Sequence, residues 1–145
     1  MKTFATAGLG LAGLALVGYL GLSLESRTVH AAAQDDEAAT PEFYKTQVQP
    51  ILQTNCYRCH GGSNHRGGLN IETRAGMLKG GHDGPVLVPG DPANSLLVRL
   101  IRHEGPPNDP MPLPPRGPKI SDQNIATVER WVRAGAIMPD PANPK

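Results

Sequence analysis

The feature that most constrains this chain is the pentapeptide Cys56-Tyr57-Arg58-Cys59-His60. The sequence contains only two cysteines, and both lie in this segment. Two thiols at this spacing fall on one turn of the chain, where both can reach the same bound group. The histidine that follows adds a nitrogen ligand at the same place. A fold for this chain therefore has to be arranged around whatever the pentapeptide binds.

The composition favours a fold that needs such a bound group. The 145 residues include 17 Gly and 15 Pro, which predicts long loops and short helices. Aromatic residues make up only 4%, so few large side chains are present to fill a core. A net charge of +1 argues against a basic nucleic-acid binder, and we expect no nucleic-acid partner.

The first 33 residues have the pattern of an export leader. Lys2 is followed by an uncharged, mostly apolar run over residues 3–24, and small residues end the segment at Ala31 and Ala33. A run of this length also approaches the roughly 20 residues that cross a bilayer. Residues 1–33 are therefore expected to be a cleaved signal peptide or a retained membrane anchor. Both interpretations place the rest of the chain outside the cytoplasm, periplasmic or anchored facing the periplasm.

The remaining sequence divides into a linker at 34–41, one domain at 42–139 and a tail at 140–145. Three stretches of the domain have apolar residues at helical spacing. They are 42–55, with Pro50 expected to kink or restart the helix, 91–103, with Asp91 as N-cap, and 121–135, with Ser121 as N-cap. A short helical turn is expected over 73–79. No stretch alternates like a strand, so the expected fold class is all-α, and the glycine-rich segment 61–90 is expected to wrap around a bound group.

The pentapeptide is typical of covalent haem attachment. Cys56 and Cys59 would each form a thioether with one porphyrin, and His60 would supply the proximal ligand to its iron. Three other interpretations remain open. A disulfide would not need His60, a thioredoxin-like redox pair needs a strand before its helix, and a zinc site needs four ligands. The other histidines, which could complete a zinc site but are expected to be exposed, are His65, His82 and His103.

A second axial ligand has to come from elsewhere in the chain. Met111 lies between Pro110 and Pro112, in a segment that would hold one side chain at low entropic cost. Met77 falls in the expected helical turn and is more typical of core packing. The full set of candidates is Met77, Met111, Met138, His65, His82 and His103. The side chains expected to surround the porphyrin are Leu96, Leu97, Leu100, Val128 and Trp131, with the Trp131 indole N–H available to a propionate.

From about Phe43 to Pro139 the chain resembles the planctomycete-type cytochrome c domain, a branch of the small class I-like cytochromes c. The matching segments are Val48-x-Pro50-Ile51-Leu52 before the pentapeptide, Gly68-Leu69, Val88-Pro89-Gly90-Asp91-Pro92, Ser95-Leu96-Leu97, Met111-Pro112, and Ile120-Ser121-Asp122 leading into Glu129-Arg130-Trp131-Val132-x-x-Gly135-Ala136. The resemblance implies one covalent haem c held by short helices and long loops. It also implies His60 as proximal ligand and Met111 as distal ligand of the iron.

The expected function is that of a monohaem c-type cytochrome, not an enzyme. It would carry single electrons between larger redox proteins outside the cytoplasmic membrane. Its donor and acceptor would include a membrane-bound respiratory or photosynthetic complex. It would act either as a soluble carrier or as a subunit tethered through residues 3–24. The alternative is a haem enzyme or a gas or redox sensor, which requires an open or displaceable sixth ligand position.

Overall fold

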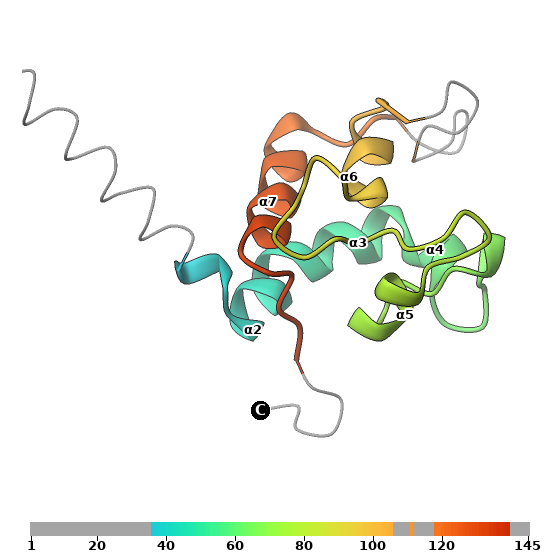
Figure 1. Ribbon diagram of the computed structural model, residues 1–145, viewed down its shortest axis with the longest axis horizontal. Helices are drawn as coiled ribbons and strands as arrows, with labels where there is room; N and C mark the ends of the chain where they lie inside the picture. The colour runs from blue at the N-terminus through green and yellow to red at the C-terminus, as the bar shows by residue number, and fades with distance from the viewer. Residues whose placement is uncertain (1–35, 106–110, 112–117, 140–145) are drawn as a thin grey trace, which may run out of the picture. The chain divides into compact units, whose positions relative to one another are not determined.

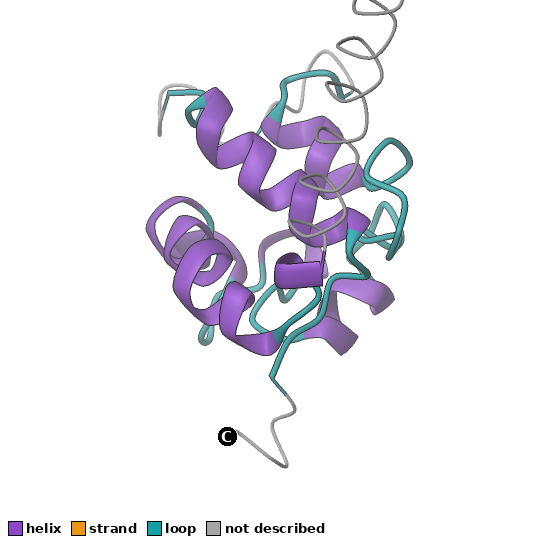
Figure 2. Cartoon of the chain, turned by 90° about the vertical axis from the view of Figure 1, so that its left-hand side faces the viewer, coloured by secondary structure: helices purple, strands orange, loops and turns teal. Residues whose placement is uncertain are grey.

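The computed structural model describes residues 36–105, 111 and 118–139. These residues form short helices joined by loops and contain no strand, only one isolated bridge between Gly81 and Gly84 (Figures 1 and 2). The expected all-α class is therefore confirmed for this part of the chain. The expected leader or anchor at 1–33 and the tail at 140–145 lie outside the described residues. Within the described ranges, no helix is both long enough and apolar enough to cross a membrane.

The first helical region is continuous in space but changes type before its proline. It consists of α2 (Pro41–Phe43), the π-helical turn η1 (Tyr44–Val48) and α3 (Gln49–Asn55). Pro50 lies in the first turn of α3, where its missing N–H costs nothing. Ahead of it the N–H of Gln49 bonds to the carbonyl of Tyr44, five residues back. The restart predicted at Pro50 is thus confirmed, and a widened turn provides it.

One short helix precedes the glycine-rich segment 61–90, and a second lies within it. The first, α4 (Tyr57–His60), follows α3 after a break at Cys56, and the second is α5 (Arg74–Lys79). The side chain of Thr73 accepts a hydrogen bond from Gly76 N–H and so caps α5, which forms within the turn predicted over 73–79. Between them lies one further turn, η2 (Arg66–Gly68). Most of the segment at 61–90 is irregular, as expected.

Helix α6 (Leu96–Ile101) begins later than the sequence indicated. Asp91 was expected to cap a helix starting at Pro92, but its carboxylate accepts hydrogen bonds from Asn94 and holds a local turn. Ser95 follows as the N-cap residue, and its side chain is fully buried. The hydroxyl donates to loop carbonyls and accepts from Val88 N–H, so it ties the loop to the start of α6. The predicted N-cap at Asp91 was wrong because the Asp91 carboxylate bonds to Asn94 within the turn that precedes the helix.

Helix α7 (Asp122–Arg133) matches its prediction closely. The Ser121 hydroxyl accepts a hydrogen bond from Asn124 N–H at 3.2 Å, the expected N-cap. The chain leaves the helix through Gly135, whose φ of 100° favours glycine. Arg74, from α5, donates to the carbonyls of Gly135 and Ala136, which fastens this exit to the other side of the domain.

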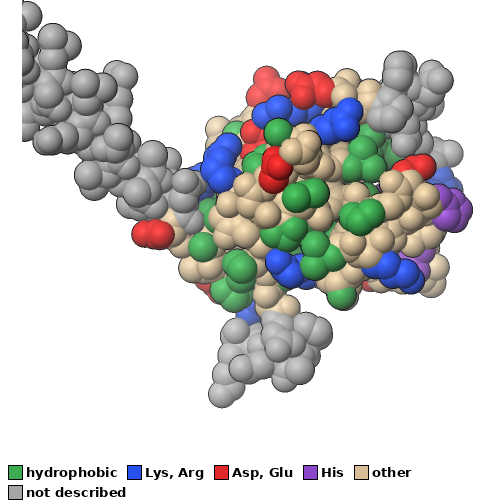
Figure 3. All heavy atoms as spheres, viewed as in Figure 1, with side chains coloured by type: hydrophobic (Ala, Val, Ile, Leu, Met, Phe, Trp, Pro, Cys, Tyr) green, Lys and Arg blue, Asp and Glu red, His purple; other side chains and the backbone are tan. Residues whose placement is uncertain are grey.

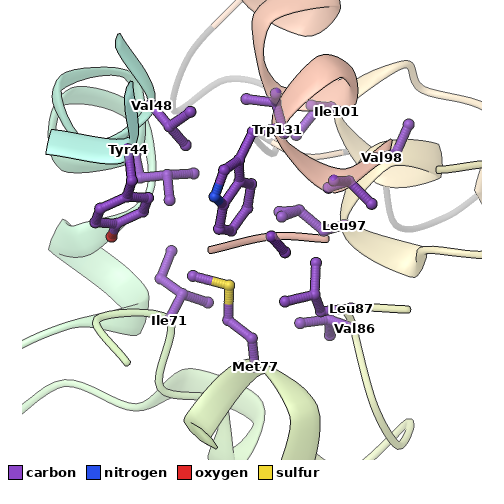
Figure 4. Packing of buried hydrophobic residues seen from close by; sticks show 14 of the residues in the cluster. Tyr44, Val48, Ile71, Met77, Val86, Leu87, Leu97, Val98, Ile101 and Trp131 are labelled. Atoms are coloured by element: carbon purple, nitrogen blue, oxygen red, sulfur yellow. The ribbon is translucent and has the colours of Figure 1, made fainter. Parts of the chain in front are cut away.

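The hydrophobic core lies between α7, α6 and the first helical region (Figure 4). Trp131 is fully buried near its centre, and its ring lies 5.4 Å from that of Tyr44. Trp131 is therefore a core residue. Its indole N–H donates to the Ile137 carbonyl at 2.8 Å, so it does not serve the expected propionate. Met77 is also fully buried, as predicted for a core residue.

The core extends into the segment that was expected to be a linker. Residues 36–38 are helical, and Ala38 is fully buried. Glu37 pairs with Arg130 of α7 at 3.0 Å, and the Arg130 guanidinium lies 4.6 Å above the Phe43 ring. Part of residues 34–41 therefore packs with the domain.

Candidate haem site

A cavity of about 530 Å³ opens beside the Cys56–His60 segment. Its lining includes four residues of the pentapeptide, the end of α3 and residues of α6. The loops at 66–71 and 81–86 close the sides. The apolar side chains in the lining are Leu69, Ile71, Val86, Leu96, Leu97, Leu100, Ile101 and Met111. Such a largely apolar hollow with a few polar groups is typical of a cofactor site.

Helix α4 gathers the cysteines and the histidine on one wall of this cavity. The N–H groups of Cys59 and His60 both donate to the Cys56 carbonyl at 3.0 Å, and Cys56 N–H donates to Leu52 at 2.8 Å. The break at Cys56 therefore starts a new turn that presents all three side chains together. Both cysteines are free thiols and half-buried. Burial, with a smaller effect of Cys59, raises the pKa of Cys56 to about 11, so its thiol is protonated at neutral pH.

His60 is oriented by a main-chain acceptor. Its Nδ1 lies 3.1 Å from the carbonyl oxygen of Arg66, a distance at which Nδ1–H donates. That bond selects the tautomer whose Nε2 carries the lone pair needed to bind iron. The carbonyl of His60 in turn accepts from Ile71 N–H at 3.0 Å. The residue is thus held from both its ring and its backbone.

Met111 lies in the lining of the same cavity as His60. It is half-buried, and its N–H donates to the Leu100 carbonyl at 3.1 Å. The flanking prolines, from which the sequence argument started, lie outside the described residues. The structure thus brings together the four predicted site residues, Cys56, Cys59, His60 and Met111.

The other candidates for the second axial ligand lie in different places. Met77 is enclosed in the core, and Met138 packs against the core. His65 is exposed and is not part of the cavity lining, whereas His82 is exposed at the cavity. Histidine side chains reach the surface at the end of the molecule where α4 and its following loop lie (Figure 3). The prediction that His103 is exposed was wrong: this residue is half-buried and follows α6 with a φ of 61°.

The structure also corrects the expected walls of the site. Leu96, Leu97 and Leu100 line the cavity, but Val128 and Trp131 do not. Those two residues are fully buried in the core behind α6. Leu69, Ile71 and Val86 also line the cavity and were not predicted to do so. The only signal for them was their position in the glycine-rich segment, because isolated apolar residues in a loop carry no periodicity.

The alternative uses of the pentapeptide find little support in the surrounding residues. Within the described ranges, no three His, Cys, Asp or Glu side chains gather to hold a metal ion. A zinc site completed by His65, His82 or His103 would need such a group. A thioredoxin-like pair would follow a strand, and helix α3 precedes Cys56 here. Haem fits better, since it needs two thiols, one histidine and a large apolar hollow.

The fold and the site together define a helical domain with the features of a c-type cytochrome. In a comparison with known proteins, residues 56–116 match the family model described as Planctomycete cytochrome C. The match begins at the first cysteine and ends beyond Met111, and it confirms the resemblance to a planctomycete-type cytochrome c domain. Cytochrome c domains are haem-binding and act in electron transfer. No curated protein matches the chain, and no solved structure matches it.

Proposed function

We propose that the protein is a monohaem c-type cytochrome that carries single electrons between larger redox proteins outside the cytoplasmic membrane. The observation that carries the proposal is the shared cavity of Cys56, Cys59, His60 and Met111. Cys56 and Cys59 would hold the haem covalently, and His60 and Met111 would be its axial ligands. When bound, haem c supplies a one-electron iron couple.

The residues of the chain would serve this couple by holding and shielding it. The Arg66 carbonyl fixes the ring of His60, and the bond to Leu100 anchors Met111. The leucines of α6 and the apolar side chains of the 66–86 loops exclude water from the cavity, which tunes the reduction potential. Two protein ligands would leave no open position for a substrate, and this favours a carrier over an enzyme.

The test is the spectrum of protein produced with haem-attachment machinery. We expect a c-type reduced-minus-oxidised spectrum and a mass increase of one haem that survives denaturation. The matched variants Cys56→Ser and Cys59→Ser should each lose one thioether bond, and the double variant should lose covalent haem. A c-type spectrum with rapid binding of carbon monoxide would favour the alternative, a haem enzyme or gas sensor with a displaceable sixth ligand. Absence of haem would overturn the proposal.

Export is a separate part of the proposal, and it rests on residues 1–33. We propose that this segment directs the domain to the periplasmic side, either cleaved or retained as an anchor through residues 3–24. Cell fractionation and N-terminal sequencing of the full chain test it. A periplasmic protein starting near Gln34 indicates cleavage, a membrane-bound protein with Met1 indicates an anchor, and a cytoplasmic protein contradicts both.

A further inference from the structure

We propose that the turn Arg66–Gly68 is a positioning element that sets how strongly His60 donates electrons to bound iron. Gly67 and Gly81 are the positioning residues on which this turn depends. The inference rests on the proposed function, because it concerns iron bound by His60. It adds two residues outside the ligand set and assigns them an effect on the reduction potential.

The first step is the bond between His60 and Arg66. The acceptor is a main-chain oxygen, 3.1 Å from Nδ1, so backbone conformation alone decides where it lies. A ligating histidine that donates its other ring N–H becomes a more basic ligand. A more basic ligand stabilises oxidised iron and lowers the reduction potential. Moving the Arg66 oxygen away would therefore raise the potential.

The second step is the conformation of Gly67. The Arg66 carbonyl belongs to the peptide plane that precedes Gly67, so the φ angle of Gly67 sets the direction of that plane relative to the following chain. This φ is 66°, which side chains other than glycine rarely adopt, asparagine being one of the better tolerated. A Cβ at Gly67 would meet nothing within 4 Å. Substitution there perturbs the backbone angle without a clash against other protein atoms, although Gly67, like Gly81, is part of the cavity lining.

The third step is the loop that holds this turn in place. His82 N–H donates to the Gly67 carbonyl at 2.8 Å. The loop turns back on itself through two 3.2 Å hydrogen bonds between Gly81 and Gly84. A Cβ on Gly81 would collide with the Gly67 oxygen, a backbone atom that cannot rotate aside. Glycine at 81 thus allows the close approach by which the loop fixes the turn.

The experiment uses haem-loaded protein and measures the reduction potential of four variants. Gly67→Val and Gly81→Ala should raise the ratio of reduced to oxidised protein at a fixed potential about threefold, an upward shift of about 28 mV for one electron. Gly67→Asn should stay near wild type, because asparagine tolerates this φ. Gly90→Val is the control for a strained backbone angle outside the cavity, whose lining includes Gly67 and Gly81. Gly90 has a φ of 84° and open space around it, and it is not part of the cavity lining.

A second measurement is the solvent exchange of the His60 Nδ1 proton, followed by NMR in the reduced protein. It should be slow in wild type and faster in Gly67→Val and Gly81→Ala. If wild type carries haem but both variants match Gly90→Val in potential and exchange, the inference is overturned and the proposed function stands. If these variants do not fold, rapid Nδ1 exchange in wild type overturns it, and slow exchange kept by Gly67→Asn supports it. A wild-type protein without haem refutes the proposed function and the inference with it.

Discussion

The backbone N–H of Met111 donates a 3.1 Å hydrogen bond to the carbonyl of Leu100. Leu100 belongs to α6, the helix whose leucines form one wall of the cavity. The anchor of Met111 is therefore a main-chain contact that does not depend on its side chain. A substitution at 111 can remove the thioether sulfur and leave this contact in place.

Met111→Ala should accordingly alter the iron without unfolding the domain. In the haem-loaded protein we expect loss of the weak near-infrared absorption of a methionine–Fe(III) bond, binding of carbon monoxide by the reduced form, and a lower reduction potential. The absorption spectrum and a carbon monoxide titration provide the measurement.

Met77→Ala is the control for this prediction. Met77 is fully buried in the core and is absent from the cavity lining. Its truncation should keep the near-infrared band and lower the free energy of unfolding by about 2–5 kcal/mol. A band that persists in Met111→Ala, or one lost in Met77→Ala in the folded protein, would contradict the assignment of Met111.

The helices of this domain were predictable where a local signal decided them. Ser121 and the apolar spacing after it gave α7, and Pro50 gave the restart of α3, because caps and prolines act within one turn. The start of α6 was predicted too early, since the Asp91 carboxylate bonds to Asn94 and Ser95 becomes the N-cap. Whether Asp91 or Ser95 becomes the N-cap depends on the buried surroundings of Ser95, which cannot be read from the spacing of residues in the sequence.

Ser95→Ala should destabilise the domain more than loss of an exposed cap would. The Ser95 hydroxyl is buried and serves both the N–H and the carbonyl of Val88. Removing it leaves the Val88 N–H without its partner, at a cost of about 1–3 kcal/mol, whereas the Val88 carbonyl keeps its bond from Asp91 N–H. Ser121→Ala, at the exposed cap of α7, should cost about 1 kcal/mol. Urea unfolding followed by circular dichroism compares the two, and equal stability losses below 1 kcal/mol would contradict the prediction.

Trp131→Phe tests the correction that this residue supports the core and does not line the site. The substitution removes the indole N–H that bonds to Ile137 and leaves a void, so we expect a loss of about 2 kcal/mol in the free energy of unfolding. The spectrum and the reduction potential of the haem-loaded protein should stay at wild-type values, because Trp131 is absent from the cavity lining. A shifted potential without loss of stability would place the indole at the haem.

The residues of the candidate site were predictable where a sequence motif contains them. The part of the site that the backbone forms was not predictable. The pentapeptide pointed to Cys56, Cys59 and His60, and flanking prolines pointed to Met111. The acceptor for His60 could not be predicted, because it is the carbonyl of Arg66 and any residue type supplies one. Its position follows from the φ of Gly67 and from a loop that returns to the turn, which are properties of tertiary structure.

The last prediction concerns the thiol of Cys56 before haem is attached. Burial raises its pKa to about 11, and the neighbouring Cys59 contributes less. A raised pKa means less thiolate at a given pH, and thiolate is the form that reacts.

In the folded Cys59→Ala apoprotein, the rate at which iodoacetamide alkylates Cys56 should still be increasing with pH between 9 and about 10.5. In urea the rate should level off above the pKa of an ordinary thiol, near ~8.5. At pH 8 the folded protein should contain roughly 200-fold less thiolate than the unfolded chain, since each pKa unit is a factor of about ten. A folded-state rate that levels off by pH 9 would show that Cys56 is more exposed than the structure describes. In haem-loaded protein the reaction should be absent at every pH, because a thioether sulfur carries no proton to lose.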